Sequence, residues 1–374
     1  MLTNRFELFS ILGFRVSLDL SWVFLAVLVT WSLATGYFPQ AVPGVDPAAA
    51  WWLGAVGALG LFASIILHEL SHSYVARQFG IPIHGITLFI FGGVAEMEDE
   101  PPSARSEFYM AIAGPIMSYV LAGLFYLLAV LLASQHLMSA LFGYLALINA
   151  VLATFNLVPA FPLDGGRVFR AAMWWWTGDY VRATRTGATL GRLFGIFLIA
   201  YGVMNLIAGF SVIGIWQALL GLFIVAASRS SEMQLTLKTG LEKVTVGQIM
   251  VRDLVSIPAD MPLDAVVEEY FYRHHHKAFP VLRDGTLLGC IRIEDVGRIP
   301  REDRAQATAV SVIDDGRPVG MVTPQTPVID ALKEMNLRQS SRLLVTENGR
   351  LRGMLTMRDI MNFLTIRKEL RDIP

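Results

Sequence analysis

Six long apolar stretches constrain the fold of this chain more than any other feature of its sequence. A bilayer core is about 30 Å thick, so a helix needs about 20 apolar residues to cross it. Hydrophobic residues fill 54% of the 374 positions and charged residues only 16%, which favours a membrane protein over a soluble one. The expected spanning helices are residues 18–37, 51–79, 108–133, 138–158, 187–208 and 211–228. A further helix at 166–177, with three consecutive tryptophans, is expected to lie at the membrane interface.

The positive charges of the apolar part predict how these helices are oriented. Residues 1–240 contain 11 of the 30 Lys and Arg residues. In a six-span topology all of these lie in termini and loops on one side, and basic residues favour the cytoplasm. We therefore expect a multi-pass protein of the cell membrane, in contact with the lipid bilayer, with cytoplasmic N- and C-termini. The net charge of −1 gives no indication of a nucleic-acid partner.

The second apolar stretch ends in a cluster of ionisable residues within ILHELSHSYVARQFG, residues 66–80. Positions i and i+4 of a helix lie on one face, so His68 and His72 can bind one metal ion. Glu69 lies beside them and can take a proton from a water molecule that the metal activates. Imidazole ligands suit zinc, and ionisable groups inside a membrane helix are costly unless they have a function. Histidines that only hold helices together are the alternative; we favour one zinc ion per chain.

A hydrolytic zinc site needs a third protein ligand, and the best candidate is Asp164 in NLVPAFPLDGGRVFR, residues 156–170. Two prolines must end the fourth span, and Gly165 and Gly166 permit a tight reversal, so we expect Asp164 on an irregular segment. Such backbone is tolerated at membrane depth where it is buried in protein or faces a wet cavity. The alternative is that Asp164 only caps the next helix. Asn156 fits either a helix-packing amide or a donor to a developing oxyanion.

The loop between the second and third spans contains ITLFIFGG, residues 86–93. The apolar run favours a strand and Gly92-Gly93 a turn, so we expect a re-entrant β-loop near 86–100. An apolar hairpin beside the site could pair with an extended substrate by adding a strand, which would make both glycines substrate-binding residues. An ordinary cytoplasmic hairpin is the alternative. We interpret Gly114-Pro115 in the third span as a packing and kink site rather than a catalytic one.

HELSH in a membrane helix, followed about 90 residues later by N-x-x-P-x-x-P-L-D-G-G, resembles the site-2 protease family of intramembrane zinc metalloproteases. The resemblance covers about residues 1–230. It implies that His68, His72 and Asp164 are zinc ligands and that Glu69 is the catalytic base. It also implies that Asn156 is the asparagine next to the site. It also implies a membrane-entering β-loop at Gly92-Gly93.

Residues 241–374 contain an internal repeat with an offset of 64 residues. FPVLRDGTLLGCIRIEDV at 279–296 aligns with LLVTENGRLRGMLTMRDI at 343–360, and each copy is expected to form helix, strand, turn, strand and helix. Two such units pack together because neither buries its apolar face alone. The pattern resembles a tandem pair of CBS domains, also called a Bateman domain. The whole chain therefore resembles the branch of the site-2 protease family that carries C-terminal CBS domains.

The CBS resemblance implies an adenine-nucleotide site in which Thr356 and Asp359 hold ribose hydroxyls. The first copy has Arg292 where a hydroxyl residue is expected, so the pattern is complete only in the second copy. A purely structural pair that forms homodimers is the alternative. The three histidines at 274–276 are interpreted as a solvated helix end, because consecutive helical residues point apart.

The predicted fold is a polytopic α-helical membrane protein with six transmembrane helices at 1–230, a linker at 231–243 and a cytoplasmic α/β tandem CBS pair at 244–374. The predicted function is an intramembrane zinc metalloendopeptidase that cleaves transmembrane segments of single-pass membrane proteins, with a CBS pair that binds nucleotide or sets the oligomeric state. One alternative is a CBS-gated metal or ion transporter, which predicts polar residues spread along several spans. A catalytically inactive binder of membrane proteins is the other, and the intact Glu69 argues against it.

Overall fold

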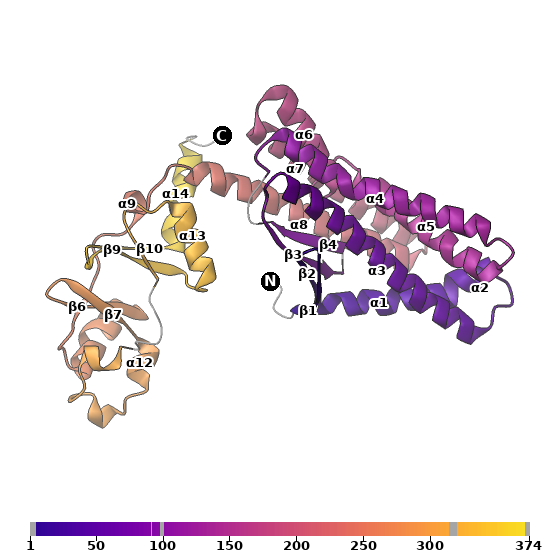
Figure 1. Ribbon diagram of the computed structural model, residues 1–374. Helices are drawn as coiled ribbons and strands as arrows, with labels where there is room; N and C mark the ends of the chain where they lie inside the picture. The colour runs from indigo at the N-terminus through magenta and orange to yellow at the C-terminus, as the bar shows by residue number, and fades with distance from the viewer. Residues whose placement is uncertain (1–4, 91, 98–100, 314–319, 371–374) are drawn as a thin grey trace. The chain divides into compact units, whose positions relative to one another are not determined.

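The computed structural model describes residues 5–90, 92–97, 101–313 and 320–370 (Figure 1). The chain divides into two compact units, Met1–Met233 and Gln234–Pro374. Long helices dominate the first unit, whereas the second contains a mixed sheet with short helices.

In the part of the chain that the structure describes, six helices are long and apolar enough to cross a membrane, which confirms the predicted number of spans. They are Leu20–Ala41, α3 (Pro47–Gln78), α4 (Ala104–Leu131), α5 (His136–Asn156), α7 (Tyr180–Ile207) and Val212–Leu241 within α8 (Ser211–Leu241). The first of them consists of α1 (Leu20–Ser32), the π-helical turn η1 (Leu33–Tyr37) and α2 (Phe38–Ala41). Because α8 continues to Leu241, most of the expected linker at 231–243 is helical.

A shorter helix, α6 (Asp164–Thr177), lies between α5 and α7 in the chain, close to the interfacial helix expected at 166–177. Trp175 and Trp176 on its last turns are exposed, as suits residues at the depth of lipid headgroups.

Side-chain caps explain where the two helices nearest the predicted metal motif begin. The Asp46 carboxylate accepts a hydrogen bond from the backbone N–H of Ala49, and Pro47 occupies the first position of α3. Ser103 accepts one from the N–H of Ser106 in the first turn of α4. Such caps satisfy N–H groups that have no partner within the helix. Helices α3, α4 and α5 then pack side by side (Figure 1).

A four-stranded sheet with the order β1-β2-β3-β4 packs on α3. The N-terminal hairpin of β1 (Arg5–Ile11) and β2 (Phe14–Asp19) joins a second hairpin of β3 (Ile83–Phe89) and β4 (Gly92–Met97), with β2 parallel to β3. Ile86 and Leu88 of β3 are buried against Leu70 of α3. The sequence indicated the second hairpin, and the first one is a finding of the structure.

The turn of the second hairpin was predicted wrongly at Gly92-Gly93. Gly92 pairs with Phe89 and Gly93 with Leu88, so the two glycines begin β4. Gly92 has a φ of 131°, a conformation that residues with a Cβ rarely adopt. Residues 91 and 98–100 of the expected loop lie outside the described residues.

The second unit contains a six-stranded sheet with the order β5-β6-β7-β10-β9-β8. Its strands are β5 (Ile257–Pro258), β6 (Ala278–Arg283), β7 (Thr286–Arg292), β8 (Met321–Val322), β9 (Arg342–Glu347) and β10 (Arg350–Thr356). Each strand of one half has its counterpart 64 residues later, and the halves meet where β7 pairs antiparallel with β10. This arrangement agrees with the sequence repeat.

Helices complete both halves of this unit, and each half has its own apolar core. They are α9 (Val246–Ile249), α10 (Leu263–Val266), η2 (Val267–Phe271), α11 (Tyr272–His274), α12 (Ile293–Gly297), η3 (Arg301–Asp303), η4 (Ala309–Val312), α13 (Val328–Leu337) and α14 (Met357–Glu369). The three histidines at 274–276 lie at the end of α11. In the part of the chain that the structure describes, they belong to no cluster of three metal-ligating side chains.

Candidate metal centre

Helix α3 carries the predicted metal-binding motif in its C-terminal half. His68 and His72 lie one turn apart, and only 3% and 8% of their surfaces are exposed. A helix satisfies its own backbone hydrogen bonds, so the groups of this segment that need polar partners are side chains, and the two imidazoles are among them.

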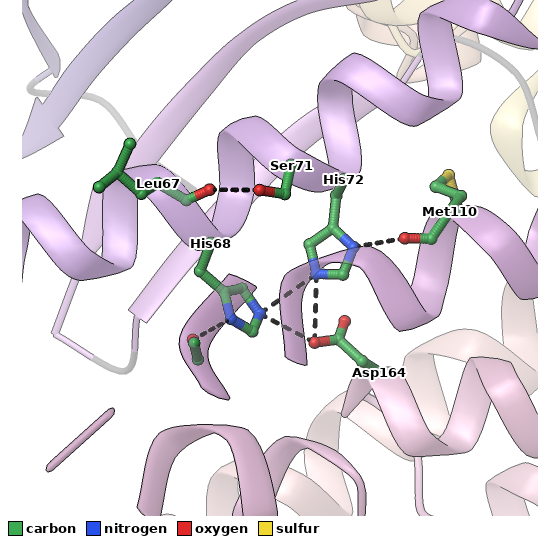
Figure 2. Close-up of polar contacts among 7 residues, drawn as sticks. Leu67, His68, Ser71, His72, Met110 and Asp164 are labelled. Carbon is green, nitrogen blue, oxygen red and sulfur yellow. Dashed lines mark hydrogen bonds and ion pairs between the residues drawn. The ribbon is translucent and has the colours of Figure 1, made fainter. Parts of the chain in front are cut away.

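Three possible ligand atoms converge at this place (Figure 2). Asp164 Oδ2 lies 3.0 Å from His68 Nε2 and 3.2 Å from His72 Nε2, and the two Nε2 atoms are 3.2 Å apart. Ligand atoms at about 2.0–2.1 Å from a tetrahedral zinc ion are about 3.3 Å from one another. The triangle therefore has the size that zinc requires. Across the described ranges, this is the cluster of three His, Cys, Asp or Glu side chains that could hold a metal ion.

The outer nitrogens of both imidazoles are held by helix α4. His72 Nδ1 donates a hydrogen bond to the carbonyl oxygen of Met110 at 2.7 Å, and His68 Nδ1 lies 2.8 Å from the hydroxyl oxygen of Ser118. A carbonyl can only accept, so the proton of a neutral His72 is on Nδ1 and the lone pair of Nε2 faces Asp164. Such partners orient metal-binding histidines.

The electrostatics of this arrangement also fit a cation. A carboxylate oxygen and two imidazole Nε2 atoms face one another at hydrogen-bond distance. Lone pairs that converge in this way repel unless a positive charge lies between them. The donor set, two neutral nitrogens and one anionic oxygen, is typical of zinc hydrolases with three protein ligands.

Asp164 is the first residue of α6, whereas the sequence placed it on an irregular segment. The irregular residues are 157–163, between α5 and α6. The alternative that Asp164 only caps α6 gains no support, because no side-chain hydrogen bond caps that helix and the carboxylate contacts the two histidines. Gly165 and Gly166 pack against the backbone of 157–161, where a Cβ would overlap main-chain atoms. These glycines permit close approach rather than a left-handed turn.

Gly114 of α4 lies directly against the two imidazoles. A Cβ at this position would be 2.5 Å from His68 Nε2 and would overlap His72 Nε2. The interpretation of Gly114-Pro115 as a packing site was therefore incomplete, because this glycine packs against the two histidines of the candidate metal site.

The predicted base, Glu69, lies next to the beginning of β4. A Cβ at Gly93 would be 2.5 Å from Cγ and 3.0 Å from Oε1 of Glu69. Strand β4 therefore passes close to this side chain, and a glycine at position 93 leaves room for it. β4 is also an edge strand of its sheet.

Asn156 is the last residue of α5 and is half-buried. Within the described part of the chain we find no hydrogen bond of its side chain, so its catalytic or packing role stays a prediction. Thr356 and Asp359 lie in the second unit, where the Thr356 hydroxyl donates to Asp359 Oδ2 at 2.6 Å in the capping box of α14.

Sequence reasoning missed the residues that support the ligands. Ser118 is fully buried in α4, and a small polar residue in an apolar span was the signal that could have identified it. Met110 accepts the hydrogen bond from His72 with its backbone carbonyl. Every residue type has this group, so the sequence gives no signal for the contact.

Helices of membrane-spanning length that enclose a His-His-Asp centre with an adjacent glutamate define a membrane metallohydrolase. Comparison with known proteins makes the class more specific. The model of Peptidase family M50 matches residues 56–142 and 132–201, and the CBS domain model matches 246–300 and 316–366.

Curated relatives extend this similarity over nearly the whole chain. "Putative zinc metalloprotease Rip3" of Mycobacterium tuberculosis is 34% identical over 361 residues, 95% of this chain and 92% of that protein. Zinc metalloprotease MJ0392 of Methanocaldococcus jannaschii is 29% identical, with 98% of both chains covered. The solved site-2 protease from Methanocaldococcus jannaschii is 27% identical, with a TM-score of 0.43, over 61% of this chain and 95% of that one. The chain belongs to Peptidase family M50, as a zinc metalloprotease with tandem CBS domains, which confirms the predicted family.

Proposed function

We propose that this metalloprotease cleaves transmembrane segments of single-pass membrane proteins, after part of the segment has unwound into an extended strand. The observation that carries the proposal is the contact between the edge strand β4 and the predicted base, through Gly93 and Glu69. A helix hides its carbonyl groups in its own hydrogen bonds, whereas an extended peptide can pair with an edge strand. A substrate paired with the outer edge of β4 would then be held close to Glu69.

In the proposed mechanism, His68, His72 and Asp164 hold one zinc ion. A zinc ion held there would supply a Lewis acid that could polarise a carbonyl and make water more acidic. Glu69 accepts a proton from the attacking water and delivers it to the leaving amine nitrogen. Asn156 is the proposed donor to the negative charge that develops on the carbonyl oxygen. Met110 and Ser118 hold the two imidazoles in the orientation that ligation needs.

The substrates can be identified by comparing membranes that contain the native chain with membranes that contain Glu69→Gln. Mass spectrometry should find transmembrane fragments of single-pass proteins that are present with the native chain and absent with the variant. Identical fragment sets would contradict the proposed substrate class.

Replacement of Gly93 with Ala is expected to reduce cleavage by about 100-fold, because a displacement of a catalytic group by about 1 Å can cost that much. The new Cβ would press on Glu69 and not on a zinc ligand, so zinc content should stay at the native level. Gly123→Ala is the matched control, since a Cβ at Gly123 meets no atom within 4 Å. Full cleavage by Gly93→Ala would contradict the proposed role of β4.

The CBS pair is proposed to bind an adenine nucleotide near Thr356 and Asp359. These residues lie at the N-terminus of α14, and the CBS resemblance gives them the role of holding ribose hydroxyls. Calorimetric titration of the chain with AMP and ATP tests this proposal. A homodimer formed through the CBS pair is the other proposed role of this unit.

We also propose that both termini are cytoplasmic. The distribution of basic residues supports this orientation.

A further inference from the structure

A buried ion pair joins the first turn of α4 to the middle of α6, outside the residues that bind metal. Glu107 is fully buried and Arg170 is only 8% exposed. Arg170 Nε donates to Glu107 Oε1 at 2.7 Å, and Arg170 Nη2 donates to the same oxygen. Burial of two charges is costly, so a pair of this kind is expected to have a role beyond general stability.

The guanidinium of Arg170 also contacts two aromatic rings. Its Nη1 donates to the hydroxyl of Tyr180, the first residue of α7, at 3.0 Å, and its carbon lies 5.0 Å from the centre of that ring. It lies 5.0 Å from the ring of Phe161 as well. Phe161 belongs to the irregular residues just before Asp164, and its carbonyl accepts a hydrogen bond from Ser228 at 2.7 Å. One side chain therefore contacts α4, α7 and the segment that leads to Asp164.

The helices that this pair connects are those that complete the metal site. Glu107 is one turn before Met110, whose carbonyl holds His72, and Ser118 follows on the same helix. Arg170 is on α6, the helix that begins with Asp164. A shift of α6 relative to α4 would change the distance between the Asp164 carboxylate and the two Nε2 atoms.

We propose that Arg170, through its ion pair with Glu107, is a positioning residue that fixes Asp164 at ligand distance from the two histidines. The guanidinium suits this task because it is planar, and it donates along several directions at once. Arg170 contacts neither metal nor substrate in this scheme. The inference rests on the zinc site proposed above.

The test uses the full-length chain in detergent or nanodiscs, with Arg170→Gln, Arg170→Lys and the control Arg185→Gln. Arg185 is an exposed arginine on α7. Zinc affinity is measured by competition with a chelator, and ligand geometry by the visible absorption of the cobalt(II)-substituted protein. Arg170→Gln should bind zinc about 10- to 100-fold more weakly, as is typical when a group that orients a metal ligand is lost. Its cobalt spectrum should also change, while Arg185→Gln stays native.

A merely structural role would lower the melting temperature of Arg170→Gln and leave zinc affinity and the cobalt spectrum unchanged, which would overturn the inference. If Arg170→Gln does not fold, Arg170→Lys tests the inference instead, because lysine keeps the positive charge but lacks the planar guanidinium with its several donors. Weakened zinc binding by the folded lysine variant supports the inference, and native binding overturns it. Absence of zinc from the native chain would instead overturn the metal site itself.

Discussion

Replacement of Glu69 with Gln is expected to abolish cleavage of a transmembrane substrate while the protein keeps its zinc. General acid–base groups contribute about 10²–10⁴-fold to rates, and Glu69 directly follows His68 on α3. Glutamine has nearly the same shape as glutamate, so the contact with Gly93 is preserved. The measurement is cleavage of a model single-pass protein in proteoliposomes, with zinc content determined on the same sample.

The same variant separates a protease from the alternative of a metal transporter. A transporter would move zinc across the liposome membrane, and a zinc-sensitive dye inside the vesicles would report that flux in the native chain and in Glu69→Gln. We expect no flux in either. Zinc flux by the native chain would favour the transporter. Undiminished cleavage by Glu69→Gln would contradict the catalytic role of Glu69.

Replacement of Gly114 with Ala is expected to remove most of the zinc. The added methyl group would occupy the space in front of both Nε2 atoms, and the imidazoles would have to turn away from Asp164. In a helix, alanine is otherwise more favourable than glycine by about 0.5–1 kcal/mol. A loss of zinc without a loss of helicity would therefore be due to the contact at the metal centre.

Gly123→Ala provides the control for this prediction, because Gly123 lies on the same helix with no atom within 4 Å of an added Cβ. It should bind zinc and cleave substrate at native levels. Gly93→Ala should differ from both, with native zinc and reduced cleavage. Native zinc content in Gly114→Ala would contradict the close approach of α4 to the histidines.

The sequence predicted the spanning helices, and it identified the three residues that the structure brings together at the candidate metal site, because strong and local physical requirements govern both. Apolar length determines whether a segment can cross a bilayer, and the spacing of His68 and His72 on one helix face is a local property. Asp164 was identifiable because acidic residues are rare at membrane depth. Its position as the first residue of α6 depends on where a helix begins again after two prolines. The helix propensities of the residues do not determine that point.

Long-range packing accounts for what the sequence did not reveal. The pairing of β2 with β3 joins segments far apart in the chain. The N-terminal hairpin itself had a local signal that the sequence analysis missed, because FRVSLD alternates apolar and polar residues. The contact of Gly114 with the histidines and the pairing of Glu107 with Arg170 depend on how α4 meets α3 and α6. No local pattern encodes such contacts between helices.

The proposed chemistry depends on one zinc ion held jointly by His68, His72 and Asp164, and the decisive experiment is metal analysis of the purified chain. The native chain should contain one zinc per chain by mass spectrometry of the metal. Asp164→Ala should retain only a small fraction of it, because two histidines alone leave the site without its anionic ligand. A native chain without stoichiometric zinc, or an Asp164→Ala variant with a full complement of zinc, would rule out this metal site.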